Sequence, residues 1–143
     1  MKIALLSILI LGIESCISNT MPTSFPQRGP SYSNTSADQT EREYQNLIKT
    51  YKPETAAVLN DLLNDSGSNS TETSVTVENL SKCNMVLTIS GTNFLKKIPI
   101  GAGKIGYSMV PKNKQYTLSG RLCNSVYNQT KYITSNYSVK LSN

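Results

Sequence analysis

The segment from Cys83 to Cys123 constrains the fold of this chain most, because it consists of short strand-like runs separated by turn residues. The predicted strands are residues 85–90, 93–100, 105–110 and 116–122, with turns at 101–104 and 111–114. Two more strands are predicted at 75–78 and 137–141. Apolar side chains alternate along several of these runs, which predicts a sheet covered on one face. We therefore expect a small antiparallel β-sandwich or barrel over residues 73–143.

Residues 38–64 have the pattern of helices. Thr40 and Glu43 have the spacing of a capping box, in which each side chain satisfies a backbone N–H at a helix start. Two apolar stripes follow at helical spacing: Tyr44, Leu47, Ile48 and Tyr51, then Val58, Leu59, Leu62 and Leu63. Pro53 separates them, so we expect either a kinked helix or a helical pair.

The predicted fold class is therefore α+β, with the helical segment followed by the small antiparallel β-domain. The two helical stripes have two possible uses. They can pack on the β-domain as part of its core, or they can bind a protein partner.

The first residues of the chain resemble an export signal. Residues 1–15 contain Lys2 and an apolar run from Ile3 to Ile13, which is shorter than a membrane-spanning helix. The sequence Ile13-Glu14-Ser15-Cys16 resembles a bacterial lipobox, although Glu14 departs from its usual pattern. We expect Cys16 to be lipidated, with palmitate among its acyl chains, and to anchor the chain to a membrane. The alternative is a plain signal peptide that leaves Cys16 as an unpaired thiol.

Residues 16–37 are rich in Ser, Asn, Thr, Pro and Gly and show no hydrophobic period. Such a composition buries too little apolar surface to offset the entropy lost on ordering. We expect a disordered tether here, and a second polar linker over residues 65–73.

Cys83 begins one strand-like run and Cys123 follows another, so antiparallel neighbours would bring the two cysteines together. Export permits oxidation, and we expect a disulfide; the alternative is two buried thiols. Strict alternation points Cys123 away from the apolar face of its strand. The disulfide therefore requires either a bulge at Gly120 or a strand end at Leu122.

Several activities are not expected. The chain has no histidine, so it lacks the usual general base of hydrolytic triads and the usual ligand of catalytic zinc. The glycines at 101, 103 and 106 fit GxGxxG, but no helical pattern follows them, and Ile98 and Ile105 break the phosphate-loop motif. We expect a turn at these glycines, no nucleotide, no nucleic acid, no cofactor, no metal and no enzymatic activity.

The β-domain is strongly basic. From Val75 onward it has nine basic residues and a single acidic residue, Glu78. Five lysines near the two turns are expected to form a binding site for an anionic surface: Lys96, Lys97, Lys104, Lys112 and Lys114. An anionic lipid or an acidic glycan would fit such a site. The alternative is a solvated basic surface that acidic residues of the helical segment partly neutralise.

Some segments resemble a known group of proteins. Residues 82–84, 98–100, 116–123 and 127–131, and more weakly 51–63, are similar to a family of uncharacterised flavobacterial lipoproteins with a C-terminal domain of unknown function. The resemblance implies a cell-envelope location and paired cysteines, and we expect the lipid anchor to lie in the outer membrane. It implies no catalytic residues.

Two functions remain open at this point. The first is a lipid-anchored, non-enzymatic binding or assembly module in which the basic β-domain engages an anionic glycan, a lipid or an envelope protein. The second is a structural accessory subunit that docks into an envelope complex through its helices.

Overall fold

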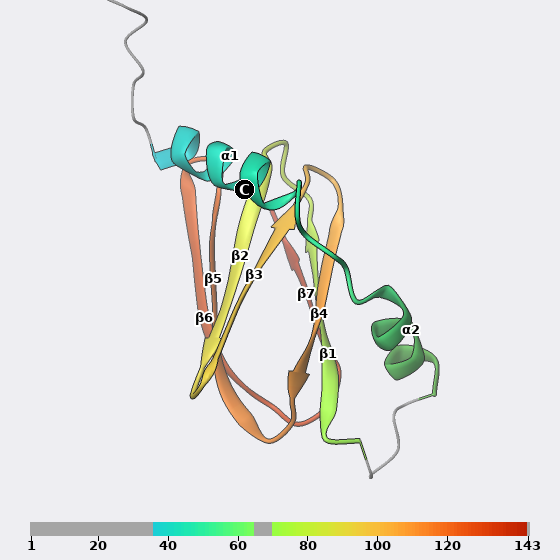
Figure 1. Ribbon diagram of the computed structural model, residues 1–143. Coiled ribbons are helices and arrows are strands. Elements are labelled where there is room, and N and C mark those ends of the chain that lie inside the picture. Colours follow the sequence, from blue (N-terminus) through green and yellow to red (C-terminus); the bar gives the residue numbers. More distant parts are fainter. Residues whose placement is uncertain (1–35, 65–69, 143) are drawn as a thin grey trace, which may run out of the picture. The chain divides into compact units, whose positions relative to one another are not determined.

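The computed structural model describes residues 36–64 and 70–142, and within them it has two helices followed by seven strands (Figure 1). The helices are α1 (Ser36–Leu47) and α2 (Thr55–Asn64). The strands are β1 (Glu72–Asn79), β2 (Met85–Gly91), β3 (Phe94–Ile100), β4 (Ile105–Pro111), β5 (Lys114–Leu122), β6 (Ser125–Ile133) and β7 (Tyr137–Leu141). The predicted α+β class is confirmed.

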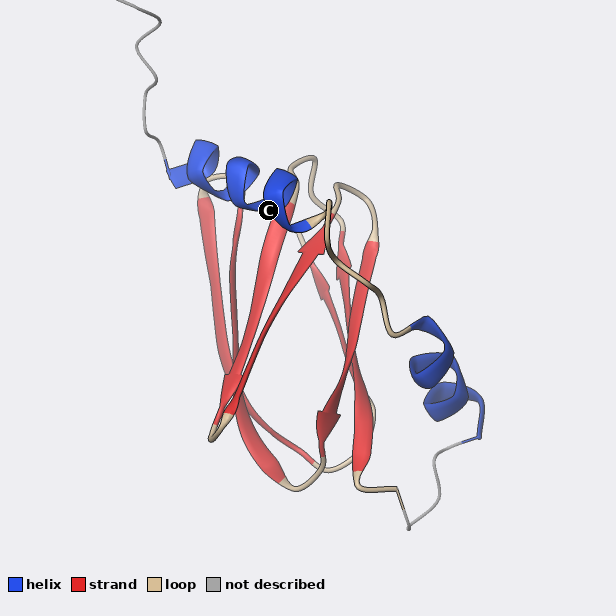
Figure 2. Cartoon of the chain, viewed as in Figure 1, coloured by secondary structure: helices blue, strands red, loops and turns tan. Residues whose placement is uncertain are grey.

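The strands form two sheets that face each other as a sandwich (Figure 2). One sheet has the strand order β4-β1-β7 and the other has the order β3-β2-β5-β6. Neighbouring strands are antiparallel except β1 and β7, which run parallel. Because both sheets have edge strands, the fold is an open sandwich and not a closed barrel.

The core lies between the sheets and follows the alternation of the strands. Tyr116 is the largest fully buried side chain, and its ring packs against that of Phe94 in a T-shaped arrangement with a centroid distance of 5.3 Å. The other core members are aliphatic or Met: Val75, Val77, Met85, Leu87, Ile89, Ile98, Ile100, Val110, Leu118, Leu122, Ile133 and Leu141. Each large apolar side chain removed from water stabilises the fold by about 1.5–3 kcal/mol.

One strand was missed by the sequence pattern. β6 pairs with β5 over its whole length, from Ser125 opposite Leu122 to Ile133 opposite Lys114. Its inner and outer faces are both largely polar and exposed, because it is an edge strand, and only Ile133 is buried. Without an apolar alternation, the usual signal for a strand is absent.

The helical segment is a pair of helices and not one kinked helix, since residues 48–54 between α1 and α2 are not helical. The predicted capping box at Thr40 was wrong. α1 begins at Ser36, and Thr40 lies inside it, where its hydroxyl donates to the Ser36 carbonyl at 3.0 Å. The predicted tether over residues 16–37 therefore extends two residues into this helix. Tyr44 is the buried residue of α1.

α1 lies at the end of the sandwich where β1 and β3 finish and β2 and β4 begin (Figure 1). The turn between β3 and β4 begins at Gly101, and Lys104 N donates to the Gly101 carbonyl at 3.1 Å. Gly103 has a φ of +65°, which confirms the turn predicted at these glycines. The Tyr44 hydroxyl lies against Gly101, where it leaves little room for a side chain.

Candidate functional site

Cys83 and Cys123 form a disulfide with a Cα–Cα distance of 5.4 Å. Cys83 lies in the connection before β2, and Cys123 lies in the two-residue turn between β5 and β6. Of the two predicted ways to orient Cys123, the strand end is the one observed. β5 stops at Leu122, Cys123 turns away with a φ of +51°, and the pairing of β5 with β6 continues through Gly120 without a bulge.

A hollow of about 280 Å³ lies beside this disulfide. Glu41 of α1 and Asn84 line it, and the Asn84 amide donates to both Glu41 oxygens at 3.1 and 3.0 Å. The Asn84 oxygen in turn accepts a hydrogen bond from Ala102 N at 3.0 Å. The hydrogen-bonding groups of Glu41 and Asn84 are therefore paired with each other and with the backbone, and these bonds connect α1 to the sandwich.

Two of the five lysines predicted to bind an anionic surface are engaged in ion pairs. Lys96 on β3 pairs with Glu54 at 2.7 Å, and Lys97 on the same strand pairs with Glu43 of α1. Adjacent residues of a strand point to opposite faces, which explains why the two lysines reach different partners. Their positive charge is already partly neutralised within the chain.

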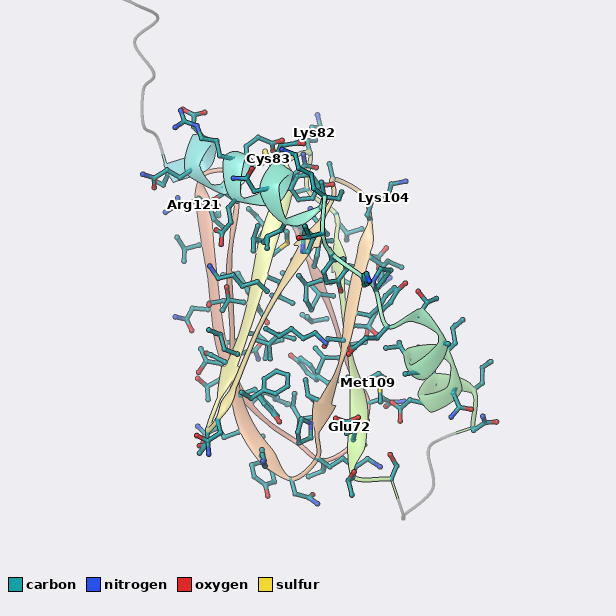
Figure 3. All side chains as sticks on the ribbon, in the orientation of Figure 1. Glu72, Lys82, Cys83, Lys104, Met109 and Arg121 are labelled. Atoms are coloured by element: carbon teal, nitrogen blue, oxygen red, sulfur yellow. A yellow bond between two sulfur atoms is a disulfide. The ribbon has the colours of Figure 1, made fainter. Side chains whose placement is uncertain are left out.

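The other three lysines lie at opposite ends of the sandwich. Lys104 precedes β4 and lies at the α1 end, as Figure 3 shows. Lys112 and Lys114 follow β4, whose last residue, Pro111, pairs with Glu72 at the far end (Figure 3). A seven-residue strand spans roughly 23 Å, so these lysines form no single cluster with Lys104.

Glu54, directly before α2, connects the two sheets. Its Oε2 atom accepts hydrogen bonds from Met109 N at 2.9 Å and from the Ser108 hydroxyl at 3.2 Å, both on β4, and contacts Lys96 of β3 at 2.7 Å. Partial burial opposes ionisation, but the bonds from Lys96, Met109 and Ser108 outweigh it and lower the pKa of Glu54 below its usual value.

Tyr51 covers the same edge of β4. Its hydroxyl donates to the Tyr107 carbonyl at 3.1 Å, and burial together with the nearby charge of Glu54 raises the pKa of Tyr51 to about 12. Tyr51 and Glu54 thus use backbone groups of β4 that an edge strand would otherwise present to solvent.

α2 is held on the sandwich by Val58 and Asp61. Both side chains are buried, and Asp61 is only 3% exposed. The Asp61 carboxylate accepts hydrogen bonds from Ser74 N at 2.7 Å and from the Thr73 hydroxyl at 3.2 Å. The contact therefore combines one apolar side chain with a buried carboxylate.

The three leucines of α2 are exposed. Leu59 is 50% exposed, Leu62 45% and Leu63 80%, and their spacing places them on neighbouring positions of the helix surface. We call Leu59, Leu62 and Leu63 the leucine face. Asp61 is the only charged residue of α2 and it is buried, so the helix presents no charged side chain to solvent. Val58 is the buried residue of the predicted stripe, and Leu62 lines a small hollow with Thr76 and Tyr137 of the three-stranded sheet.

Sequence reasoning missed Glu54, Asp61 and Asn79 as structural polar residues. Asn79 is fully buried; its amide nitrogen donates to the Cys83 carbonyl at 2.8 Å and the Gly101 carbonyl at 3.1 Å. Its oxygen accepts from Ser81 N and from the Ser81 hydroxyl. An Asn side chain often bonds to the backbone two residues further on, so the spacing Asn79-Leu-Ser81 could have indicated this turn, but the sequence does not show that Asn79 is buried.

Within residues 36–64 and 70–142, no helix is long and apolar enough to span a membrane. The same residues contain no group of three or more Cys, Asp or Glu side chains placed to hold a metal ion. The predicted signal at 1–15 and the predicted lipidation site at Cys16 lie outside the described residues.

Comparison with known proteins identifies one family. Residues 48–143 match a domain of unknown function, DUF6759, whose span includes α2, both sheets and the disulfide. No curated protein and no solved structure matches the chain. Since the matched segment is more than half of the sequence, the chain belongs to the DUF6759 family.

Proposed function

We propose that this chain is a non-enzymatic assembly module of the bacterial cell envelope that binds a protein partner through the leucine face of α2. The observation that carries the proposal is the exposure of Leu59, Leu62 and Leu63 on a helix with no exposed charge. Contiguous apolar surface of this kind is characteristic of interaction sites in soluble domains.

The way α2 is attached supports this function. Val58 and Asp61 hold α2 on β1 and β4. Because the helix is already fixed in place, little conformational entropy is lost when the leucine face binds a partner. An amphipathic helix in an apolar groove is a common mode of protein recognition, with anchors at i, i+3 and i+4. Leu59, Leu62 and Leu63 have that spacing.

We further propose that a lipid on Cys16 holds the module at a membrane, in the manner of a flavobacterial lipoprotein of the outer membrane. The lipobox-like sequence that ends at Cys16 and the apolar run before it support this anchor. Diacylation with palmitate-type chains would suffice for stable attachment.

Binding to an anionic glycan or lipid is the second candidate function. The excess of basic over acidic residues from Val75 onward favours it. The ion pairs of Lys96 and Lys97 and the separation of Lys104 from Lys112 and Lys114 weigh against a single basic site. We therefore place the protein-binding function first.

The test is co-purification from intact cells after crosslinking, with matched leucine variants. Leu59→Gln/Leu63→Gln should abolish recovery of a discrete partner protein. Leu95→Gln should leave it unchanged, because Leu95, on β3 and away from α2, has an exposed fraction between those of Leu59 and Leu63. Equal recovery with both variants would refute the leucine face. Salt-sensitive binding to anionic vesicles that survives the double substitution would favour the second candidate.

A further inference from the structure

β6 is an edge strand whose outer side is paired with no other strand among the described residues. It has nine residues, contains no proline, and pairs with β5 in an unbroken register. A long, regular edge strand presents unpaired N–H and C=O groups and can receive another strand. β4, at an edge of the other sheet, differs because Tyr51 and Glu54 cover it.

The residues that direct backbone groups outward can be identified from the hairpin. Its loop has two residues, so Leu122 and Ser125 form the hydrogen-bonded pair that closes it. From Ser125 onward, every second residue of β6 therefore directs its N–H and C=O groups toward β5. Ile133 agrees with this pattern, because its carbonyl accepts a hydrogen bond from Asn113 N at 2.7 Å. The residues between them direct their backbone N–H and C=O groups toward the unpaired side of β6: Val126, Asn128, Thr130 and Tyr132.

The sequence of β6 is complementary to itself about Gln129. In an antiparallel pair centred there, Val126 lies opposite Tyr132 of a second copy, and the same contact occurs again by symmetry. These two are the exposed large apolar residues of β6, at 67% and 59% exposure. The centred register also places all four outward-facing residues in hydrogen-bonded positions, which allows about eight main-chain hydrogen bonds.

The charged side chain of β6 itself does not oppose this pairing. Lys131 is the one charged residue of β6, and in the centred register it lies opposite Tyr127 of the second copy. The two Lys131 side chains start roughly 14 Å apart, beyond the screening length at physiological salt. Within its own chain, the Lys131 ammonium group lies 5.5 Å from the centre of the Tyr137 ring. Tyr127 of the second copy would give this cation a second aromatic neighbour, which is a favourable contact.

We propose that two copies of this chain form a two-fold symmetric dimer by antiparallel pairing of their β6 strands, centred on Gln129. A single strand edge buries less surface than a standard interface, so the dimer forms and dissociates with protein concentration. α2 contacts β1 and β4, away from β6, and the dimer therefore leaves both leucine faces accessible. The proposal is independent of what the leucine face binds.

Disulfide trapping tests the register. In the centred pair the two Gln129 residues are directly opposite and not hydrogen-bonded, with Cα atoms about 4.5 Å apart, which is within reach of a disulfide. The two Thr130 residues are offset by two positions and lie more than about 7 Å apart. In the full chain carrying Cys16→Ser, Gln129→Cys should form a covalent dimer under mild oxidation at least about tenfold faster than Thr130→Cys. Equal rates, or no dimer from Gln129→Cys, would overturn the proposal.

A proline variant tests the edge without introducing a thiol. Asn128→Pro removes an outward N–H and leaves the β5–β6 ladder intact, whereas Asn128→Ala keeps that N–H. Sedimentation of the full chain over a concentration series should show a dimer for the parent chain and for Asn128→Ala. Asn128→Pro should weaken it by at least about tenfold, with an unchanged circular dichroism spectrum. A parent chain that stays monomeric at millimolar concentration, or a folded Asn128→Pro chain that dimerises normally, contradicts the proposal.

Discussion

Lys96 on β3 and Glu54, the residue before α2, form an ion pair of 2.7 Å that links the two sheets of the sandwich. Glu54 is also hydrogen-bonded to β4 through Met109 N, so one carboxylate joins an edge strand of each sheet. A lysine that appears in the sequence to belong to a basic surface therefore has a structural role.

This link predicts a pH-dependent stability. The pKa of Glu54 is lowered in the folded chain, so its contribution is complete above the pKa of the unfolded carboxyl and is lost as the pH falls through the folded pKa. Glu54→Gln should lower the free energy of unfolding by about 1 kcal/mol at neutral pH, a value reduced for partial exposure. Urea unfolding should show the difference from the parent chain shrinking below about pH 4.

Glu43→Gln is the control for this prediction. It removes the acidic partner of Lys97, but that pair is exposed on both sides and contributes little. If Glu54→Gln lowers the free energy of unfolding by the same amount at pH 7 and at pH 2, ionisation of Glu54 is not the cause of the loss.

The disulfide should stabilise the domain, and the conformation of Cys123 allows a finer test. In the chain-entropy model, closure of a forty-residue loop contributes about 4 kcal/mol, which Cys83→Ala/Cys123→Ala should lose. With a φ of +51°, position 123 favours glycine, so Cys83→Ala/Cys123→Gly should be more stable than the double-alanine variant by about 1 kcal/mol. Thermal unfolding of both variants measures the difference, and an alanine variant at least as stable as the glycine variant would contradict this view of the turn.

Asp61 should determine whether α2 stays on the sandwich. Asp61→Ala leaves Ser74 N without its acceptor and should lower the free energy of unfolding by about 2 kcal/mol. Amide exchange should accelerate in α2 before it accelerates in the sheets. Asn60→Ala, on the exposed side of the same helix, should leave both quantities near those of the parent chain. Unchanged protection of α2 in Asp61→Ala would mean that Val58 and the hydrogen bond between Thr55 and Tyr107 fix the helix without Asp61.

The proposed anchor at Cys16 gives a prediction on membrane association. Processing of the exported chain should be sensitive to globomycin, and the mature protein should partition into the detergent phase, because acyl chains would attach it to the membrane. Both properties should disappear in Cys16→Ser. A Cys16→Ser chain that remains in the membrane fraction would contradict lipid anchoring at this residue.

Most of the sandwich could be predicted because its strands bury one face. β2 to β5 carry alternating or continuous apolar residues, and the sequence pattern located each within a few residues. β6 lies at an edge with both faces largely exposed, so it shows no apolar alternation, and its content of Val, Ile, Thr and Tyr is the one strand signal that it carries. The disulfide was predictable from the position of two cysteines at the ends of strand-like runs.

The surface of the domain could not be predicted in the same way. Ion pairs such as Lys97 with Glu43 join residues far apart in the sequence, and a charge count cannot show which lysines they use. The leucines of α2 have the spacing of a buried stripe, but the helix is held by Val58 and Asp61 instead. A buried carboxylate depends on the backbone groups that surround it, and these are known only from the fold.

Site-specific photo-crosslinking in intact cells tests the central claim most directly. A photo-reactive leucine analogue in place of Leu63 should yield a covalent adduct of one discrete mass with another protein, and the adduct should be lost when Leu59→Gln is added. The same analogue in place of Leu95, which is 70% exposed on β3, should yield no such adduct. Adducts that are equal at the two positions, or absent at Leu63, would contradict a docking role for the leucine face.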